Sequence, residues 1–467
     1  MPPTHAPDPS RRRFIRQACC AAVGSTGLLS SLASLRLIGA IARPGDAPVT
    51  AAAIPSDYKA LVCLFLQGGN DANNLIIPVD AASYAAYVSA RSNLALPAAG
   101  VLPIIPRTAD GRSWALHPAL AEFRALFASG QAALMANVGT LVQPTTLAQY
   151  RAGSVPLPKQ LFSHSDQQVQ WQSSVPDRPS TTGWGGRLAD LVNAANTNPQ
   201  LSMSLSLAGT NFFQVGSQVS QYAISSSGAI TFAGTTGGNN PLRYAAQKDL
   251  LAQAQPALFD AAFAGLSGAA IASSDLVNTV LATTFPATTL GNQLKMAAKL
   301  ISTSAAFGLK RQIFFCQVGG YDLHASQVNA ADPLTGSHAT LFTQLSQALG
   351  AFYRATVELG VASQVTTFTA SDFGRTYSSN GDGSDHGWGN HQLILGGAVR
   401  GGDIYGRMPV LTVNGPDDTG RGRWIPTTSV DEYAGTLARW FGVSATDLGT
   451  VLPNISRFPH PNLGFLG

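Results

Sequence analysis

Two apolar runs in this chain end in nearly the same way, and that ending limits the folds that the chain can adopt. The run ALVCLFL at 60–66 leads into Gln-Gly-Gly-Asn-Asp, and the run QIFFCQV at 312–318 leads into Gly-Gly-Tyr-Asp-Leu-His. Each run is typical of a strand that is buried on both faces. The glycines allow a tight turn where the strand ends. A third run, QVTTFTAS at 364–371, is followed directly by Asp372.

Helical patterns alternate with these strands. The predicted helices lie at 117–130, 241–266, 286–310, 337–360 and 429–442, and further strands are predicted at 131–139 and 390–399. This alternation predicts an α/β fold with a mainly parallel sheet sandwiched by helices. Residues 201–240 are rich in Ser and Gly and nearly free of charge, which indicates a small β-rich insertion.

The N-terminus carries an export signal. Arg11 and Arg12 lie in SRRRFIR, and a weakly apolar run with a small-residue end follows. The pair is typical of a leader read by the twin-arginine translocase. We therefore expect a signal peptide at 1–42, a linker at 43–57, one domain at 58–467, and a periplasmic or secreted protein. The apolar run is interrupted by Arg36 and by Ser and Gly residues, so no stable membrane span is expected in the mature protein.

Removal of the leader would also remove the excess positive charge. Residues 1–42 contain five of the 29 Lys and Arg residues and one of the 25 Asp and Glu residues, which leaves 24 of each. No basic surface is therefore predicted for nucleic acid. Of the four cysteines, only Cys63 and Cys316 lie beyond the leader, each within an apolar run. They are either two buried thiols or a disulfide between neighbouring strands.

Acidic residues and histidines follow the three strands. The carboxyl ends of parallel strands meet at one edge of a sheet, where ligands bind. Carboxylate and imidazole together suit zinc, manganese or iron, and we expect a divalent metal, zinc first, with manganese, iron or calcium as alternatives. The alternative is that these residues cap turns and donate or accept hydrogen bonds. The candidate metal ligands are Asp71, Asp322, His324, Asp372, Asp385, His386 and His391.

The segment QLFSHSDQQVQWQS at 160–173 offers a nucleophile. Ser163 or Ser165 would lie at the N-terminus of a helix, where backbone N–H groups favour anions. Next to a metal, such a hydroxyl could attack a phosphate or sulfate ester; in the simpler interpretation it only caps the helix. His164 is the less favoured acid or base, and Arg375 could clamp an anionic substrate or pair with a buried carboxylate.

Several motifs resemble one bacterial family. They are LFLQGGND, FSHSDQQVQW, TGWGGR, GGYDLHASQ, SDFGRT and DHGWGNHQLILGGAVRGGDIYG, spread over about 58–443. Together with the leader they look like the domain of unknown function 1501 family, whose fold is thought to be similar to the alkaline phosphatase and sulfatase superfamily. The resemblance implies one or two metals bound by Asp and His at strand ends.

The resemblance also implies individual roles. Asp71 would be the first-strand ligand, Asp322 and His324 the middle pair, and His391 the last histidine. The superfamily's Asp-His pair corresponds either to Asp372, which Phe373 follows, or to Asp385 with His386. Ser163 matches the nucleophile best.

These observations predict an exported metal-dependent hydrolase that acts on a small-molecule or polymeric phosphate or sulfate ester, with Ser163 and Arg375 as catalytic residues. The alternative is a non-catalytic exported protein that uses the same fold to bind an envelope polysaccharide or a partner protein.

Overall fold

The architecture is α/β. The computed structural model describes residues 56–196, 201–226, 238–253, 264, 277 and 280–467. The predicted signal peptide and nearly all of the linker lie outside the described residues. Among the described residues, no helix is both long and apolar enough to cross a membrane.

Within the described residues, nine strands form one mixed, mostly parallel sheet with the order β11-β5-β10-β9-β1-β8-β6-β7, and β12 also pairs with β5. The strands are β1 (Lys59–Leu66), β5 (Ala132–Gly139), β6 (Ser204–Ser206), β7 (Tyr222–Ala223), β8 (Arg311–Val318), β9 (Val365–Ser371), β10 (Asn390–Gly396), β11 (Ile404–Tyr405) and β12 (Thr428–Ser429). A second, antiparallel sheet consists of β2 (Ile76–Pro78), β4 (Trp114–Leu116) and β3 (Leu102–Ile104).

The predicted central strands are present, and β1 lies in parallel between β8 and β9. Strand β10 is antiparallel to both β5 and β9, so the sheet is not parallel throughout. The predicted β-rich segment 201–240 contains β6 and β7, which extend the main sheet in parallel; residues 227–237 lie outside the described residues.

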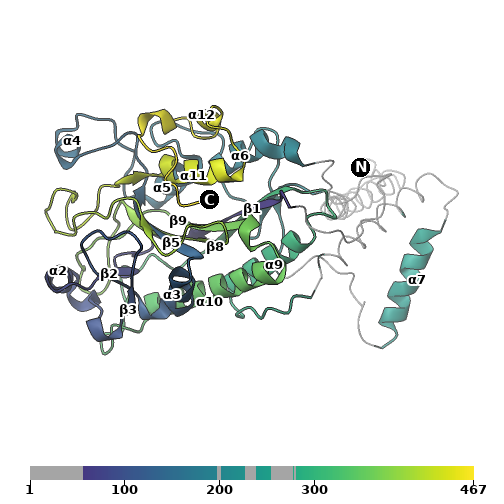
Figure 1. Cartoon of the computed structure of the whole chain (residues 1–467), viewed down its shortest axis with the longest axis horizontal. Helices are drawn as coiled ribbons and strands as arrows, with labels where there is room; N and C mark the ends of the chain where they lie inside the picture. The colour runs from purple at the N-terminus through teal and green to yellow at the C-terminus, as the bar shows by residue number, and fades with distance from the viewer. Residues whose placement is uncertain (1–55, 197–200, 227–237, 254–263, 265–276, 278–279) are drawn as a thin grey trace, which may run out of the picture. The chain divides into compact units, whose positions relative to one another are not determined.

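Helices cover both faces of the main sheet. In Figure 1, α3, α9 and α10 lie below the sheet, and α5, α6, α11 and α12 lie above it. The helices are α2 (Ala81–Arg91), α3 (Ala121–Ala128), α4 (Leu147–Ala152), α5 (His164–Ser173), α6 (Trp184–Val192), α9 (Thr289–Ser302), α10 (Ser337–Glu358), α11 (Val430–Phe441) and α12 (Leu448–Val451). The capping serine predicted before α11 is Ser429, whose side chain accepts from the Glu432 backbone N–H.

The chain divides into two units. One comprises 51–229 and 277–467 and contains both sheets. The other comprises 1–50 and 230–276, and its described part includes α7 (Asn240–Ala252). The site described below lies entirely in the first unit.

The two cysteines are free thiols in the core. Cys63 pairs in register with Phe315, whereas Cys316 pairs with Leu64. Side chains that are adjacent along a strand point to opposite faces of the sheet. Cys63 and Cys316 therefore lie on opposite faces, which decides between the two predicted alternatives in favour of buried thiols.

Candidate metal centre

The residues that follow β1, β8 and β9 lie close together, and Gly68, which follows β1, contacts the residues after the other two strands. Gly68, with φ +114°, donates its N–H to Asp372 Oδ1 at 3.1 Å. A Cβ on Gly68 would lie 2.5 Å from the Asp322 backbone nitrogen, so only glycine lets the two strand ends approach this closely. The glycine of the first motif thus makes room for the aspartate of the second.

Three side chains form a compact group of possible metal ligands: His164, Asp322 and His386. His164 Nε2 lies 3.1 Å from His386 Nε2 and 3.5 Å from Asp322 Oδ1, and His386 Nε2 lies 3.4 Å from the same oxygen. Tetrahedral ligands at zinc bond lengths are separated by about 3.3 Å. The three atoms therefore have the spacing expected of ligands around one zinc-sized cation.

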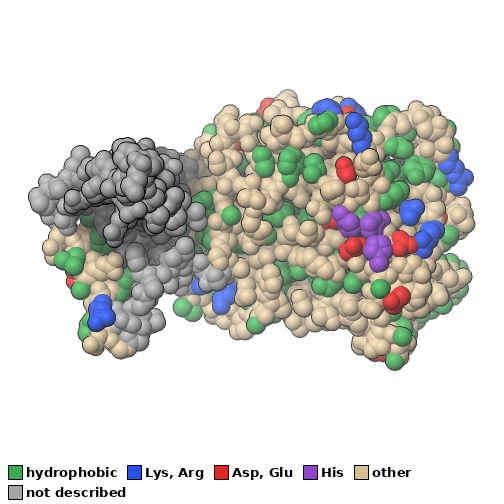
Figure 2. Space-filling model, turned by 180° about the vertical axis from the view of Figure 1, so that it is seen from behind, with side chains coloured by type: hydrophobic (Ala, Val, Ile, Leu, Met, Phe, Trp, Pro, Cys, Tyr) green, Lys and Arg blue, Asp and Glu red, His purple; other side chains and the backbone are tan. Residues whose placement is uncertain are grey.

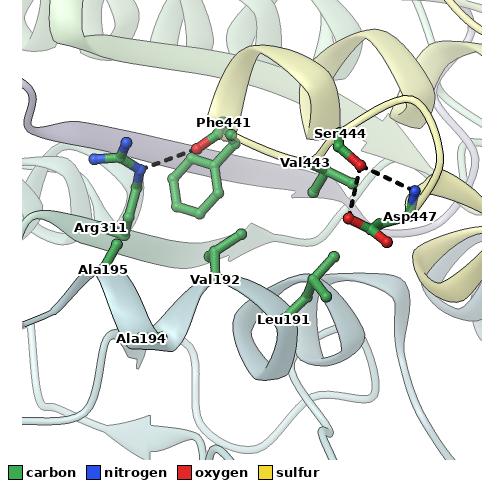
Figure 3. Close-up of a pocket in the computed structure, with 10 residues that line it drawn as sticks. Leu191, Val192, Ala194, Ala195, Arg311, Phe441, Val443, Ser444 and Asp447 are labelled. Carbon is green, nitrogen blue, oxygen red and sulfur yellow. Dashed lines mark hydrogen bonds between the residues drawn. The ribbon is translucent and has the colours of Figure 1, made fainter.

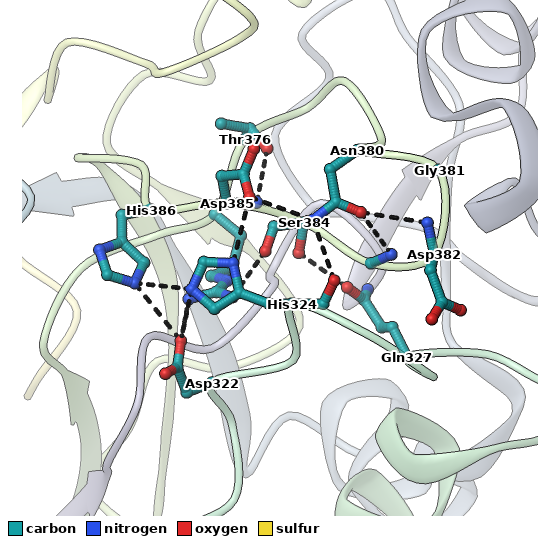
Figure 4. Close-up of polar contacts among 12 residues, drawn as sticks. Asp322, His324, Gln327, Thr376, Asn380, Gly381, Asp382, Ser384, Asp385 and His386 are labelled. Carbon is teal, nitrogen blue, oxygen red and sulfur yellow. Dashed lines mark hydrogen bonds and ion pairs between the residues drawn. The ribbon is translucent and has the colours of Figure 1, made fainter.

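His324 adds a fourth donor beside this triangle. Its Nε2 lies 2.9 Å from His386 Nε2 and 3.2 Å from Asp322 Oδ1, as Figure 4 shows. Asp322 and His324 are 45% and 44% exposed, so the group opens to solvent. Figure 2 shows the histidines gathered in one cluster on the surface, with acidic and basic side chains close beside it.

The other ring nitrogen of each histidine contacts an oxygen that accepts hydrogen bonds. The Nδ1 atoms of His164, His324 and His386 donate to Asp372 Oδ2 at 2.7 Å, Asp385 Oδ1 at 3.1 Å and the Phe162 carbonyl at 2.7 Å. A neutral histidine that carries its proton on Nδ1 presents a lone pair at Nε2. Three lone pairs and a carboxylate oxygen thus face one another, an arrangement that a shared cation stabilises. The residues present fit a divalent metal.

Charged neighbours favour the ionised form of Asp322. Its partial burial alone would raise the pKa, but the hydrogen bond and charge of Arg375, together with His164 and His324, lower the pKa below its usual value. Burial lowers the pKa of His386, and the charge of Arg375 lowers it further despite the hydrogen bond to the Phe162 carbonyl. Both groups are therefore in the protonation state that binds a metal near neutral pH.

Two predicted ligands lie behind the histidines instead of among the metal donors. Asp372 is completely buried, and its Oδ2 accepts from His164 and from Gln168 Nε2 at 2.8 Å. Asp385 accepts from His324 and from Arg421, and although burial raises its pKa, these and the Asn380 hydrogen bond lower it to about 2. The structure places both carboxylates where they orient a ligand.

Asp71, the predicted first-strand ligand, lies in a separate buried network. Its carboxylate forms an ion pair with Arg91 and accepts from Gln327 Nε2 at 2.5 Å. Burial alone would raise its pKa, but Arg91, His338 and Gln327 lower it below the usual value. Arg91, from α2, already neutralises this charge, so Asp71 is not among the groups brought to the metal centre.

His391 also lies apart from the metal centre. Its Nδ1 accepts from the Asn137 backbone N–H at 3.0 Å, and its side chain is buried in β10. Burial lowers its pKa to about 4. The structure gives it a neutral, hydrogen-bonded position in the core.

Arg375 is a partner of Asp322, not a surface clamp. Its side chain is 0% exposed; one terminal nitrogen donates to Asp322 Oδ1 at 2.7 Å, and the other donates to the Ser384 carbonyl at 2.6 Å. A guanidinium that is completely buried cannot reach a bound ester. Of the two roles considered for Arg375, pairing with a carboxylate is the one that the structure supports.

Ser163 is the N-cap residue of α5, but its hydroxyl makes no capping bond. It donates instead to Asp166 Oδ2 at 2.6 Å, and its Oγ lies 3.2 Å from Ser165 Oγ. Both serines flank His164, so the predicted nucleophile is next to a metal donor along the chain.

Sequence reasoning underrated His164 and missed Gln168. Both lie on the first turns of α5, four residues apart, so their side chains lie on the same face. The spacing H-x-x-x-Q directly after Ser163 was the available signal. A single histidine in a polar loop is otherwise hard to distinguish from a solvent-exposed one.

The opposite end of β8 shows a different environment. There, a hollow of about 280 Å³ is lined by Arg311 and by side chains from α6 and α11. Figure 3 shows that its polar groups bond locally: Arg311 donates to the Phe441 carbonyl and Ser444 bonds Asp447. No histidine lines this hollow. Among the described residues, the possible metal donors His164, Asp322 and His386 lie together, with Asp322 just beyond the carboxyl end of β8.

Comparison with known proteins identifies the family of this chain. The model of a protein family of unknown function, DUF1501, matches residues 58–420. The chain belongs to the DUF1501 family. A search of curated proteins finds no match to the sequence of this family member.

Three solved structures that are similar to this DUF1501 protein show distant likeness. An alkaline phosphatase superfamily protein from Vibrio parahaemolyticus is 12% identical, with 91% of this chain and 78% of that chain covered and a TM-score of 0.35. A sulfatase from Pseudoalteromonas sp. is 11% identical, with coverages of 88% and 70% and a TM-score of 0.33. A phosphonate monoester hydrolase from Silicibacter pomeroyi is 8% identical, with coverages of 82% and 73% and a TM-score of 0.34.

Proposed function

We propose that this protein is an exported, metal-dependent hydrolase of phosphate or sulfate esters. The observation that carries the proposal is the convergence of His164, His386 and Asp322 within 3.5 Å of one another on a solvent-facing surface. Structural metal sites are usually closed, whereas catalytic sites leave a position open for substrate. The proposal of export rests on the leader at 1–42, and with it the periplasmic or secreted location.

A divalent cation held by His164, Asp322 and His386, with His324 beside them, would supply Lewis acidity to an ester oxygen. The mixed imidazole and carboxylate donor set suits zinc first. Asp372 and Asp385 hold the imidazole rings in the orientation that presents Nε2, which is the usual task of a carboxylate behind a metal-bound histidine.

Ser163 is the proposed nucleophile. Its hydroxyl donates to Asp166 Oδ2 at 2.6 Å, so a carboxylate is in place to accept the proton when the oxygen attacks the ester phosphorus or sulfur and the bond to the alcohol of the ester breaks. Water would then release phosphate or sulfate and restore the serine hydroxyl. Arg375 acts indirectly, because it holds Asp322 in the donor group without reaching the substrate itself.

The test is turnover of 4-nitrophenyl phosphate and 4-nitrophenyl sulfate by the purified protein. We expect hydrolysis of at least one ester to be lost after chelation and restored by zinc. The His386→Ala variant should lose at least 100-fold in rate, while His460→Ala, which removes an exposed histidine at the C-terminal end of the chain, should match the wild type. A protein that binds metal yet hydrolyses neither ester nor related diesters would contradict the proposal and favour the binding-protein alternative.

A further inference from the structure

The loop that follows β11 places another basic residue, Arg423, in contact with the metal donor His386. Arg423 Nε donates to the backbone carbonyl of His386 at 2.9 Å. The guanidinium carbon lies 4.7 Å from the centre of the Phe162 ring, and Phe162 supplies the carbonyl that holds His386 Nδ1. Arg423 is therefore anchored on one metal donor, His386, and on Phe162, the residue whose carbonyl orients that donor.

This loop is fixed by a buried carboxylate. Asp418 is 0% exposed and accepts from the backbone N–H groups of Asn414, Gly420, Gly422 and Arg423 at 2.7–2.9 Å. Gly422, with φ +74°, passes so close to Tyr377 that an added Cβ would lie 2.2 Å from the tyrosine Cβ. The backbone that carries Arg423 is thus set by specific contacts, which is how binding residues are pre-organised.

Arg423 differs from the other two arginines near the centre in having no acidic partner among the described residues. Arg375 pairs with Asp322, and Arg421 pairs with Asp385. The Nε atom of Arg423 is held by the His386 carbonyl, and the guanidinium lies over the Phe162 ring. Among the described residues, no hydrogen-bond acceptor contacts the two terminal nitrogens of Arg423. That edge of a guanidinium is the one that binds an oxyanion with two parallel hydrogen bonds.

We propose that Arg423 binds a second oxyanion of the substrate, next to the ester group that reacts at the metal centre. The inference rests on the proposed function and narrows it. The substrate class is then an ester on a carrier that bears at least one more sulfate or carboxylate group. A neutral carrier would leave the guanidinium edge without a partner.

The experiment compares binding of a single anion and of polyanions by titration calorimetry. The zinc-loaded, full-length protein is titrated with inorganic sulfate, sucrose octasulfate and trigalacturonate. The Arg423→Met variant keeps the apolar stem over Phe162 but removes the charge. Arg151→Met, on the exposed face of α4, is the matched control for loss of one positive charge.

We expect Arg423→Met to weaken binding of one polyanion about tenfold, with less than a twofold change for inorganic sulfate. The polyanion that shows the loss identifies the second group as sulfate or carboxylate. Equal effects of Arg423→Met and Arg151→Met, or no binding of either polyanion, would overturn the inference. Turnover of 4-nitrophenyl esters that persists in that case would leave the proposed function intact. Absence of turnover in the wild type would contradict the proposed function, and anion binding by Arg423 would then no longer define a substrate class.

Discussion

The two Gly-Gly-x-Asp segments have nearly the same sequence and lie on neighbouring parallel strands, yet their aspartates have opposite environments. Asp322 is 45% exposed and faces three histidines. Asp71 is 2% exposed and is locked to Arg91. Leu66 pairs with Val318, so Asp71 lies one residue farther from its strand than Asp322 does. A motif can therefore place a carboxylate at a sheet edge, but its neighbours decide whether that carboxylate binds a metal or supports the fold.

The largest expected effect concerns the buried pair. Arg91→Met would leave Asp71 without its cation, and breaking a buried ion pair from one side costs about 3–5 kcal/mol of unfolding free energy. Urea denaturation of metal-free protein measures this loss. In the same assay His324→Ala, at the exposed centre, should change stability by less than about 1 kcal/mol.

The double variant Asp71→Asn/Arg91→Met is the control for this prediction. Because it removes both charges, it should recover more than half of the loss. If Arg91→Met is as stable as His324→Ala, the Asp71–Arg91 ion pair does not have the structural role proposed for it.

The second expected effect is on the pH dependence of stability, and it comes from the buried region around Asp71. Burial lowers the pKa of His338, which lies next to Asp71, from 6.5 to about 4. Above pH 6.5, His338 is neutral in both the folded and the unfolded protein, and its contribution to stability is complete. As the pH falls from 6.5 towards 4 the unfolded chain binds the proton first, so roughly 3 kcal/mol of stability is lost.

Urea midpoints between pH 7 and pH 4 should therefore decrease less steeply in His338→Gln than in wild type. His460→Gln, at an exposed position, is the control and should follow the wild-type slope. An unchanged slope in His338→Gln would show that this histidine is not buried in its neutral form.

The smallest effect is at the centre itself. Asp372→Asn replaces one acceptor oxygen by an N–H donor behind His164, which disturbs the ring orientation. Loss of such a carboxylate lowers metal affinity 10- to 100-fold. Competition with a chromogenic chelator measures the change, and Asp382→Asn, on the exposed turn of the neighbouring loop, should have no effect. Equal metal affinities of Asp372→Asn and Asp382→Asn would show that Asp372 does not support the metal centre.

Much of the fold could be predicted because burial leaves a local signature. The central strands and the helices at 337–360 and 429–442 were located within a few residues, since apolar runs and helical periodicity are properties of short segments. The helix predicted at 286–310 is shorter in the structure, where it ends at Ser302. The direction of β10 could not be predicted, because a strand buried on both faces has the same pattern whether it runs parallel or antiparallel.

The site was predictable in part for the same reason. Asp322, His324, Asp385 and His386 follow two strand ends and were expected together. The fate of Asp71 depends on Arg91, which is 20 residues away on α2, and no local pattern reveals that pair. The place of His164 in the site could be predicted only with the knowledge that α5 begins over the ends of β8 and β9.

The central claim is that one metal binds among the histidines and that Asp71 takes no part. Elemental analysis of the folded protein, of His386→Ala and of Asp71→Asn tests it directly. The account predicts one equivalent of a divalent metal in the wild type and in Asp71→Asn, and none in His386→Ala. Two equivalents in the wild type, or loss of metal in a folded Asp71→Asn protein, would place Asp71 in the metal centre and contradict the account.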